Sequence, residues 1–213
     1  MNKEALNLIE NYYNDNSDKI FGIYPSGSSC LPFINRCGDN DFLILAKTED
    51  YIADLNKEIF KLSGIDGLKL FPYNTDTGQI KIDMMVRKTD FFDFNANKYY
   101  PIWLYQFHFM NEAGQLHGNK YKFVEMLECD ELKIKDSIYR YKLMMDYNWA
   151  TLPDGTSPKY YYQIIASTIF LYNKSYTLTD EEKEIINLAH ERHLSKEKRK
   201  WFEDKYNDWL QAI

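Results

Sequence analysis

The stretch Tyr24-Pro-Ser-Gly-Ser-Ser29 is followed by a second motif, Asp39-Asn-Asp-Phe42, and residues 29–38 separate Ser28 from Asp39. Short apolar runs typical of strands lie on either side, at Lys19–Tyr24 and Phe42–Ala46. Successive side chains of a strand face opposite sides, so Asp39 and Asp41 should share one face. Two carboxylates on one face repel unless a cation lies between them, and Mg²⁺ prefers such oxygen ligands. The stretch therefore predicts two strands that carry an acidic cation site.

A third acid lies further along the chain, in a segment with strand periodicity. In Ile80–Val86 the apolar Ile80, Ile82 and Met84 alternate with other residues, and Asp83 is one of those others. An acid among apolar neighbours is costly to bury without a partner or a metal. If this strand lies beside Phe42–Ala46, Asp83 completes a triad for two Mg²⁺ ions, with Mn²⁺ as an alternative ion.

The loop before the first two acids has the residues that a phosphate-binding turn needs. Gly27 permits a tight turn and lets the backbone approach a phosphate closely. The backbone N–H groups there, together with the Ser28 hydroxyl, can bind the β- and γ-phosphates of a nucleotide. We therefore expect Gly27 and Ser28 to bind nucleotide and Asp39, Asp41 and Asp83 to be both metal ligands and catalytic residues.

This pattern resembles that of the polymerase-beta-like nucleotidyltransferases, which have Gly-Ser, a spacer of about ten residues, Asp-x-Asp and a third acid on a later strand. Here the matching parts are Gly27-Ser28, Asp39-Asn40-Asp41 and Asp83, within the first ninety residues. The chain as a whole is also similar to small nucleotidyltransferases of bacteriophages. The resemblance implies a mixed-sheet fold and magnesium-dependent transfer of a nucleoside monophosphate from a triphosphate such as ATP, with loss of pyrophosphate. At Asn40 and Ser26 the chain departs from the family, which usually has apolar residues there.

Strand patterns are confined to the first ninety residues, and helical patterns follow. We therefore expect an α+β protein, with a mixed-sheet nucleotidyltransferase lobe over 1–90 and an all-helical lobe over 91–213. Further helices are expected before the first strand and after Thr48, which is a good N-cap. In the second lobe, helical spacing covers five segments: Tyr121–Cys129, Ile134–Trp149, Lys159–Tyr172, Thr179–His193 and Ser195–Leu210.

Composition limits the partners. The net charge of −6 argues against a protein that coats nucleic acid by bulk electrostatics. Three cysteines without a CxxC pair indicate reduced thiols, and neither a signal peptide nor a membrane span is evident, so we expect a soluble, cytoplasmic protein.

The nucleoside triphosphate is the expected substrate, and no membrane partner is expected. The acceptor stays open between an RNA end, a small-molecule alcohol and a protein side chain, as do the preferred base and the oligomeric state.

Several other residues have both a functional and an ordinary structural interpretation. A basic face near the C-terminus can bind RNA, although such a helix is usually only solvated. His117 lies between glycines, as a turn residue or a phosphate contact, and the aromatic run Tyr160–Tyr162 can stack on a base or pack in the core. Lys142 and Lys159 are candidates for a triphosphate-binding cation. The basic face near the C-terminus consists of Arg192, Lys196, Arg199 and Lys200.

Two other functions fit the same residues. The chain can be a non-catalytic module that binds a nucleotide or a partner on a nucleotidyltransferase fold. It can also be a helical docking protein in which the acids are incidental. The three acids in order favour the enzyme.

Overall fold

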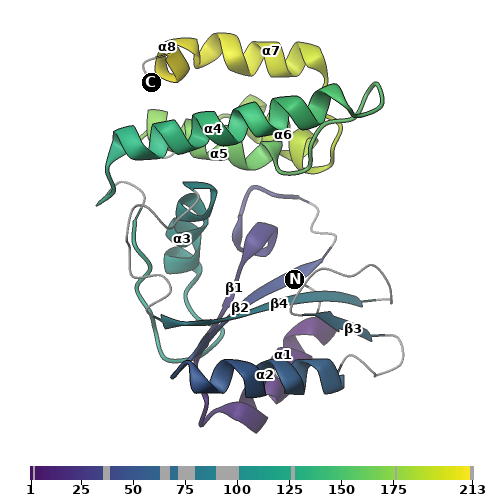
Figure 1. Ribbon diagram of the computed structural model, residues 1–213, viewed down its shortest axis with the longest axis vertical. Coiled ribbons are helices and arrows are strands. Elements are labelled where there is room, and N and C mark those ends of the chain that lie inside the picture. The colour runs from purple at the N-terminus through teal and green to yellow at the C-terminus, as the bar shows by residue number, and fades with distance from the viewer. Residues whose placement is uncertain are drawn as a thin grey trace. The chain divides into compact units, whose positions relative to one another are not determined.

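The computed structural model describes residues 1, 3–35, 39–62, 68–71, 80–89, 101–125, 128–175 and 177–211. The chain divides into two compact units (Figure 1). The first unit contains Met1–Pro32, Arg36–Phe94 and His108–Val124, and the second contains Phe33–Asn35, Asn95–Phe107 and Glu125–Ile213. The predicted boundary after residue 90 falls within 90–100, outside the described residues, and stays a prediction.

The first unit is built on a mixed five-stranded sheet in the order β3-β4-β2-β1-β5. Strand β2 pairs in parallel with β4, which pairs in parallel with β3, whereas β1 is antiparallel to both β2 and β5. The strands are β1 (Ile20–Pro25), β2 (Asn40–Ala46), β3 (Leu68–Phe71), β4 (Ile80–Lys88) and β5 (His117–Gly118). The predicted α+β class is confirmed, and the expected neighbourhood of β2 and β4 is confirmed with it.

Helices α1 (Lys3–Asn16) and α2 (Asp50–Leu62) cover one face of this sheet (Figure 1). Their apolar stripes pack on Phe42, Ile44 and Met84, which are fully buried. Because side chains alternate along a strand, the neighbours of these residues in β2 and β4 point to the opposite face of the sheet. The core beneath the helices includes Ala5, Ile9, Tyr12, Ile20, Ile23, Ala46, Leu55, Ile59, Ile82 and Val86. The packing of this core thereby directs Asp41 and Asp83 to the face that α1 and α2 leave uncovered.

The helix expected over Tyr121–Cys129 is wrong for residues 121–125, which form neither helix nor strand. Hydrogen bonds to other elements explain the difference. The Tyr121 backbone N–H donates to the Tyr24 hydroxyl at 2.5 Å. The side-chain amide of Asn111, on α3 (Pro101–Ala113), bonds both backbone groups of Phe123, each at 2.9 Å. These long-range bonds satisfy backbone groups that a helix would otherwise pair locally.

The second unit contains helices α4 (Glu131–Ala150), α5 (Tyr161–Tyr172), α6 (Asp180–His190), α7 (Lys196–Lys205) and α8 (Asn207–Gln211). Every residue of α5 from Tyr161 to Leu171 is buried, which makes it the central helix of the unit. Asp130 caps α4 through the backbone N–H groups of Leu132 and Lys133. The predicted capping box of α6 is confirmed, because Thr179 and Glu182 bond each other's backbone N–H.

Glu182 also ties α6 to the end of α7. Its Oε2 accepts from the Thr179 N–H at 2.9 Å, and its Oε1 accepts from Lys205 Nζ at 2.9 Å and from the Tyr206 hydroxyl. Burial by itself raises the pKa of this carboxyl, but the bonds from Tyr206, Lys205 and the Thr179 N–H outweigh burial and hold the pKa below its usual value.

In the described part of the chain, no helix combines the length and the apolar composition needed to cross a membrane.

We predict that Glu182→Gln keeps the helix cap but lowers the free energy of unfolding by about 1–3 kcal/mol at neutral pH, because a buried charge-assisted network is lost. A lowered folded-state pKa contributes stability above the unfolded value of about 4.3, and this contribution disappears as the pH falls through the folded value. The difference between the two proteins should therefore shrink below about pH 4. Urea denaturation from pH 3 to 8 measures it, with exposed Glu181→Gln as the control. A pH-independent difference would contradict the prediction.

Candidate metal centre

Three carboxylates converge on the sheet face that α1 and α2 leave uncovered. Asp39, Asp41 and Asp83 each offer an oxygen, and these three atoms lie within 4.8 Å of one another. The parallel register of β2 and β4 places Asp41 directly beside Asp83. Asp39 lies immediately before β2, and its carboxylate reaches the same cluster. Asp39 is buried, while Asp41 and Asp83 are half-buried. The predicted convergence is confirmed, and the cluster could hold a metal ion.

Gly27 lies against one of these carboxylates. Its φ is +54°, and a Cβ added to it would overlap Asp41 Oδ2 and come within 2.8 Å of Asp41 Cγ. Such an approach is far below van der Waals contact, and residues with a Cβ also disfavour positive φ. Glycine is therefore required here for the backbone turn and for the position of the Asp41 carboxylate.

Two serines hold this loop onto the start of β2. The Ser26 N–H donates to the Asp41 carbonyl oxygen at 2.9 Å, which extends the β1–β2 pairing past Pro25. The Ser29 hydroxyl accepts from the Asp41 N–H at 3.0 Å and donates to the Asp39 carbonyl oxygen at 3.4 Å. Ser29 was not among the residues expected at the site. Its place in a Gly-Ser-Ser loop was a signal, because a short hydroxyl side chain there can bond nearby backbone groups.

Asn40, the polar residue between the first two acids, has a structural role. It is buried, and its Nδ2 donates to the Lys81 carbonyl oxygen on β4 at 3.1 Å. This bond joins the start of β2 to β4 beside the carboxylates. The departure from an apolar residue at this position is therefore accounted for by a cross-strand hydrogen bond.

Lys81 is a second residue of the site that was not expected there. Its Nζ lies 2.9 Å from Asp39 Oδ2, and the two side chains are 18% and 8% exposed. The signal was present in the alternation of β4, since Lys81 precedes Asp83 by two residues and must share its face. The described part of the site thus includes the Lys81 ammonium group beside the three carboxylates.

The structure limits how the loop can bind phosphate. Ser28 is buried within the short 3₁₀ helix η1 (Gly27–Cys30). The Ser29 N–H donates to the Ser26 carbonyl oxygen at 3.0 Å, so this backbone group serves the turn itself. A phosphate contact at this loop would therefore depend on Gly27 and Ser28 rather than on Ser29.

Several other candidates lie away from the triad within their own units. His117 forms part of β5 and stacks on Tyr13 of α1, with ring centroids 5.3 Å apart. Lys142 pairs with Asp146 at 2.8 Å and with Glu203 at 3.4 Å, so it is an internal cation of the second unit.

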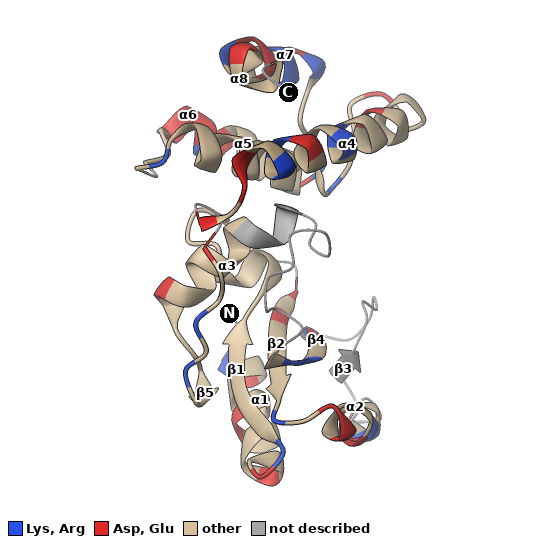
Figure 2. Ribbon diagram, turned by 60° about the vertical axis from the view of Figure 1, so that its left-hand side comes forward, with Lys and Arg blue, Asp and Glu red and all other residues tan. Residues whose placement is uncertain are grey.

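The basic face near the C-terminus is also engaged in part. Arg199 pairs with Asp146 and Glu203 at 2.9 and 2.8 Å, and Lys200 pairs with Asp204 at 3.0 Å. Helix α7 carries both signs of charge along its length (Figure 2). This surface is therefore mixed in charge rather than a basic stripe.

The remaining aromatic and thiol candidates are mostly structural. Tyr161 and Tyr162 are buried in α5, whereas Tyr160 is 45% exposed. The Cys30 thiol donates to the Gly27 carbonyl oxygen at 3.2 Å. Cys129 is a free thiol, and burial, with a smaller contribution from the charge of Glu128, raises its pKa to about 11. A thiol with that pKa stays protonated at neutral pH. Cys37 lies outside the described residues.

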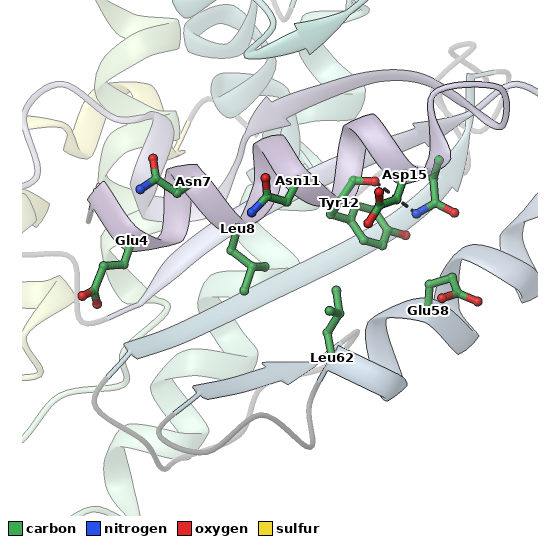
Figure 3. Close-up of a pocket in the computed structure, with 9 residues that line it drawn as sticks. Glu4, Asn7, Leu8, Asn11, Tyr12, Asp15, Glu58 and Leu62 are labelled. Atoms are coloured by element: carbon green, nitrogen blue, oxygen red, sulfur yellow. Dashed lines mark hydrogen bonds between the residues drawn. The ribbon is translucent and has the colours of Figure 1, made fainter.

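The first unit has a cavity of about 370 Å³ between α1 and α2, over Leu8, Tyr12 and Leu62 (Figure 3). Its rim carries the carboxylates of Glu4, Asp15 and Glu58. None of the residues that line this cavity belongs to the triad or to the Gly27 loop.

Comparison of the sequence with family models and with curated proteins yields no matching family model and no matching protein. The functional conclusion therefore rests on the geometry of the triad.

We predict that Gly27→Ala destabilises the first unit and weakens any stabilisation by Mn²⁺, because the new methyl group displaces the Asp41 carboxylate. Gly114→Ala is the matched control: its φ is +73°, and an added Cβ would have no atom within 4 Å. The free energy of unfolding of this control should fall by only about 1–2 kcal/mol, which is the cost of holding an alanine at positive φ. Thermal unfolding with EDTA and with Mn²⁺ compares them, and equal behaviour of the two variants would contradict the role given to Gly27.

Proposed function

We propose that this chain is a metal-dependent nucleotidyltransferase that transfers a nucleoside monophosphate from a nucleoside triphosphate to a hydroxyl acceptor. The observation that carries the proposal is the convergence of Asp39, Asp41 and Asp83 beside the positive-φ turn at Gly27. The order of these parts along the chain and their places on the strands agree with the polymerase-beta-like resemblance. The mixed sheet is consistent with that type of fold.

The chemistry of the donor set fits a divalent cation. Two carboxylates about 4 Å apart repel by about 4 kcal/mol at an effective dielectric constant of about 20. Three such groups within 4.8 Å are therefore unfavourable without cations, and Lys81 contributes only one positive charge. Hard carboxylate oxygens are the ligands that Mg²⁺ and Mn²⁺ favour. Bound by Asp39, Asp41 and Asp83, such an ion would neutralise charge on the phosphates and polarise them for attack.

The protein residues have distinct parts in the proposed transfer. Gly27 lets the loop backbone approach the triphosphate, and the Ser28 hydroxyl is the proposed donor to a phosphate oxygen. An acceptor oxygen forms a bond to the α-phosphorus while the bond from that phosphorus to the bridging oxygen breaks, and pyrophosphate leaves. Asp83 is the proposed base that receives the acceptor's proton.

The acceptor is proposed to be an RNA end, a small-molecule alcohol or a protein hydroxyl. These classes differ in the partner that must reach the triad, and an acceptor panel with labelled nucleotide distinguishes them. The charge-mixed surface of α7 makes bulk attraction to RNA weak at physiological salt.

A second candidate is a binding module that holds a nucleotide without chemistry. The ion pair between Lys81 and Asp39 favours it, because it reduces the negative charge that the triad offers to catalytic metal ions. The two candidates differ in turnover: the module binds nucleoside triphosphates but releases no pyrophosphate with any acceptor.

We predict that Asp41→Asn and Asp83→Asn each lower nucleotide transfer by at least about 1,000-fold while the fold is retained, because each removes a charge on which phosphoryl transfer depends. Pyrophosphate release with the four nucleoside triphosphates and the acceptor panel measures the effect, and circular dichroism checks the fold. Asp54→Asn on the exposed side of α2 is the control and should keep full activity. Full activity of both triad variants would end the proposal.

A further inference from the structure

We infer that Lys81 is a built-in counter-ion of the carboxylate triad, which stabilises the metal-free site and lowers its affinity for a divalent ion. The inference rests on the metal-binding part of the proposed function. It concerns the charge of the site before any substrate is present.

The position of Lys81 is set by the sheet rather than by a flexible surface contact. Parallel pairing of Asn40 with Ile82 and of Asp41 with Asp83 fixes the register of β2 and β4 here. Lys81, just before Ile82, thereby reaches Asp39, which lies just before Asn40. Both side chains are largely shielded from water, at 18% and 8% exposure. Screening is weaker in such a place, so this ion pair affects its neighbours more strongly than the exposed pairs of the surface helices do.

The contact leaves Asp39 able to bind a metal. Lys81 Nζ lies 2.9 Å from Oδ2, and a carboxylate has a second oxygen and further lone pairs. Asp39 can therefore bond the ammonium group through Oδ2 and offer Oδ1 to an ion. Asp39 can then contact both the Lys81 ammonium group and an ion bound by the triad.

Charge explains why Lys81 weakens cation binding. Three carboxylates carry −3 and the Lys81 ammonium carries +1, which gives −2 for this group of four described residues. Without Lys81 the same group carries −3 and should bind a divalent ion more tightly.

The test uses the full chain and Mn²⁺ alone, titrated by calorimetry and followed by the electron paramagnetic resonance signal of free Mn²⁺. Lys81→Met should bind Mn²⁺ at least about tenfold more tightly than the wild type, because a nearby positive charge is removed. Its melting temperature in EDTA should fall by roughly 3 °C or more and should recover when Mn²⁺ is added.

Two further variants control the result. Lys81→Arg keeps the charge and should bind Mn²⁺ with an affinity within about threefold of the wild type. Lys61→Met removes an exposed ion pair with Glu58 on α2 and should leave Mn²⁺ binding unchanged. If Lys81→Met does not fold, Lys81→Gln serves in its place with the same expectation.

Unchanged Mn²⁺ affinity in Lys81→Met overturns the inference. Absence of Mn²⁺ binding in every variant overturns the inference and the metal site together. If binding follows the expectation but no acceptor yields pyrophosphate, the counter-ion role stands and the nucleotidyltransferase proposal fails.

Discussion

Electrostatic repulsion among three carboxylates is the constraint around which the first unit is arranged. The parallel pairing of β2 with β4 forces Asp41 and Asp83 to be neighbours, and Asp39, immediately before β2, adds its carboxylate to them. The apolar residues between them are buried under α1 and α2, so the strands cannot turn these acids away without exposing the core. A fold that accepts this repulsion has a cluster of carboxylates that could hold a divalent metal ion.

The loop that precedes β2 is built as part of the same site. Gly27 touches the Asp41 carboxylate, while Ser26 and Ser29 bond the backbone on both sides of Asn40. A group of residues held in this way is organised before any ligand arrives, which reduces the ordering that binding requires. The close packing of the loop on the acids also explains why the turn needs glycine and short hydroxyl side chains.

Local pattern was sufficient for the main features of the fold and the triad. Alternation in β2 and β4 placed Asp39, Asp41 and Asp83 on the correct face, because apolar residues must face the core. Alternation alone could not show that Lys81 pairs with Asp39, since that depends on which strands are neighbours and in which register. The segment at 121–125 was misjudged because its backbone bonds go to Tyr24 and Asn111, residues distant in the sequence. Side-chain partners of this kind are decided by tertiary structure, as the pairing of Lys142 with Glu203 also shows.

The carboxylate of Glu182 joins two helices that are separated along the chain. One of its oxygens caps α6, and the other accepts from Lys205 and Tyr206 at the end of α7. Loss of α7 would leave this buried oxygen without those donors, and the start of α6 would then lose part of its support. Helices α6 and α7 should therefore form and melt together as one cooperative block, in which hydrogen exchange slows or quickens jointly.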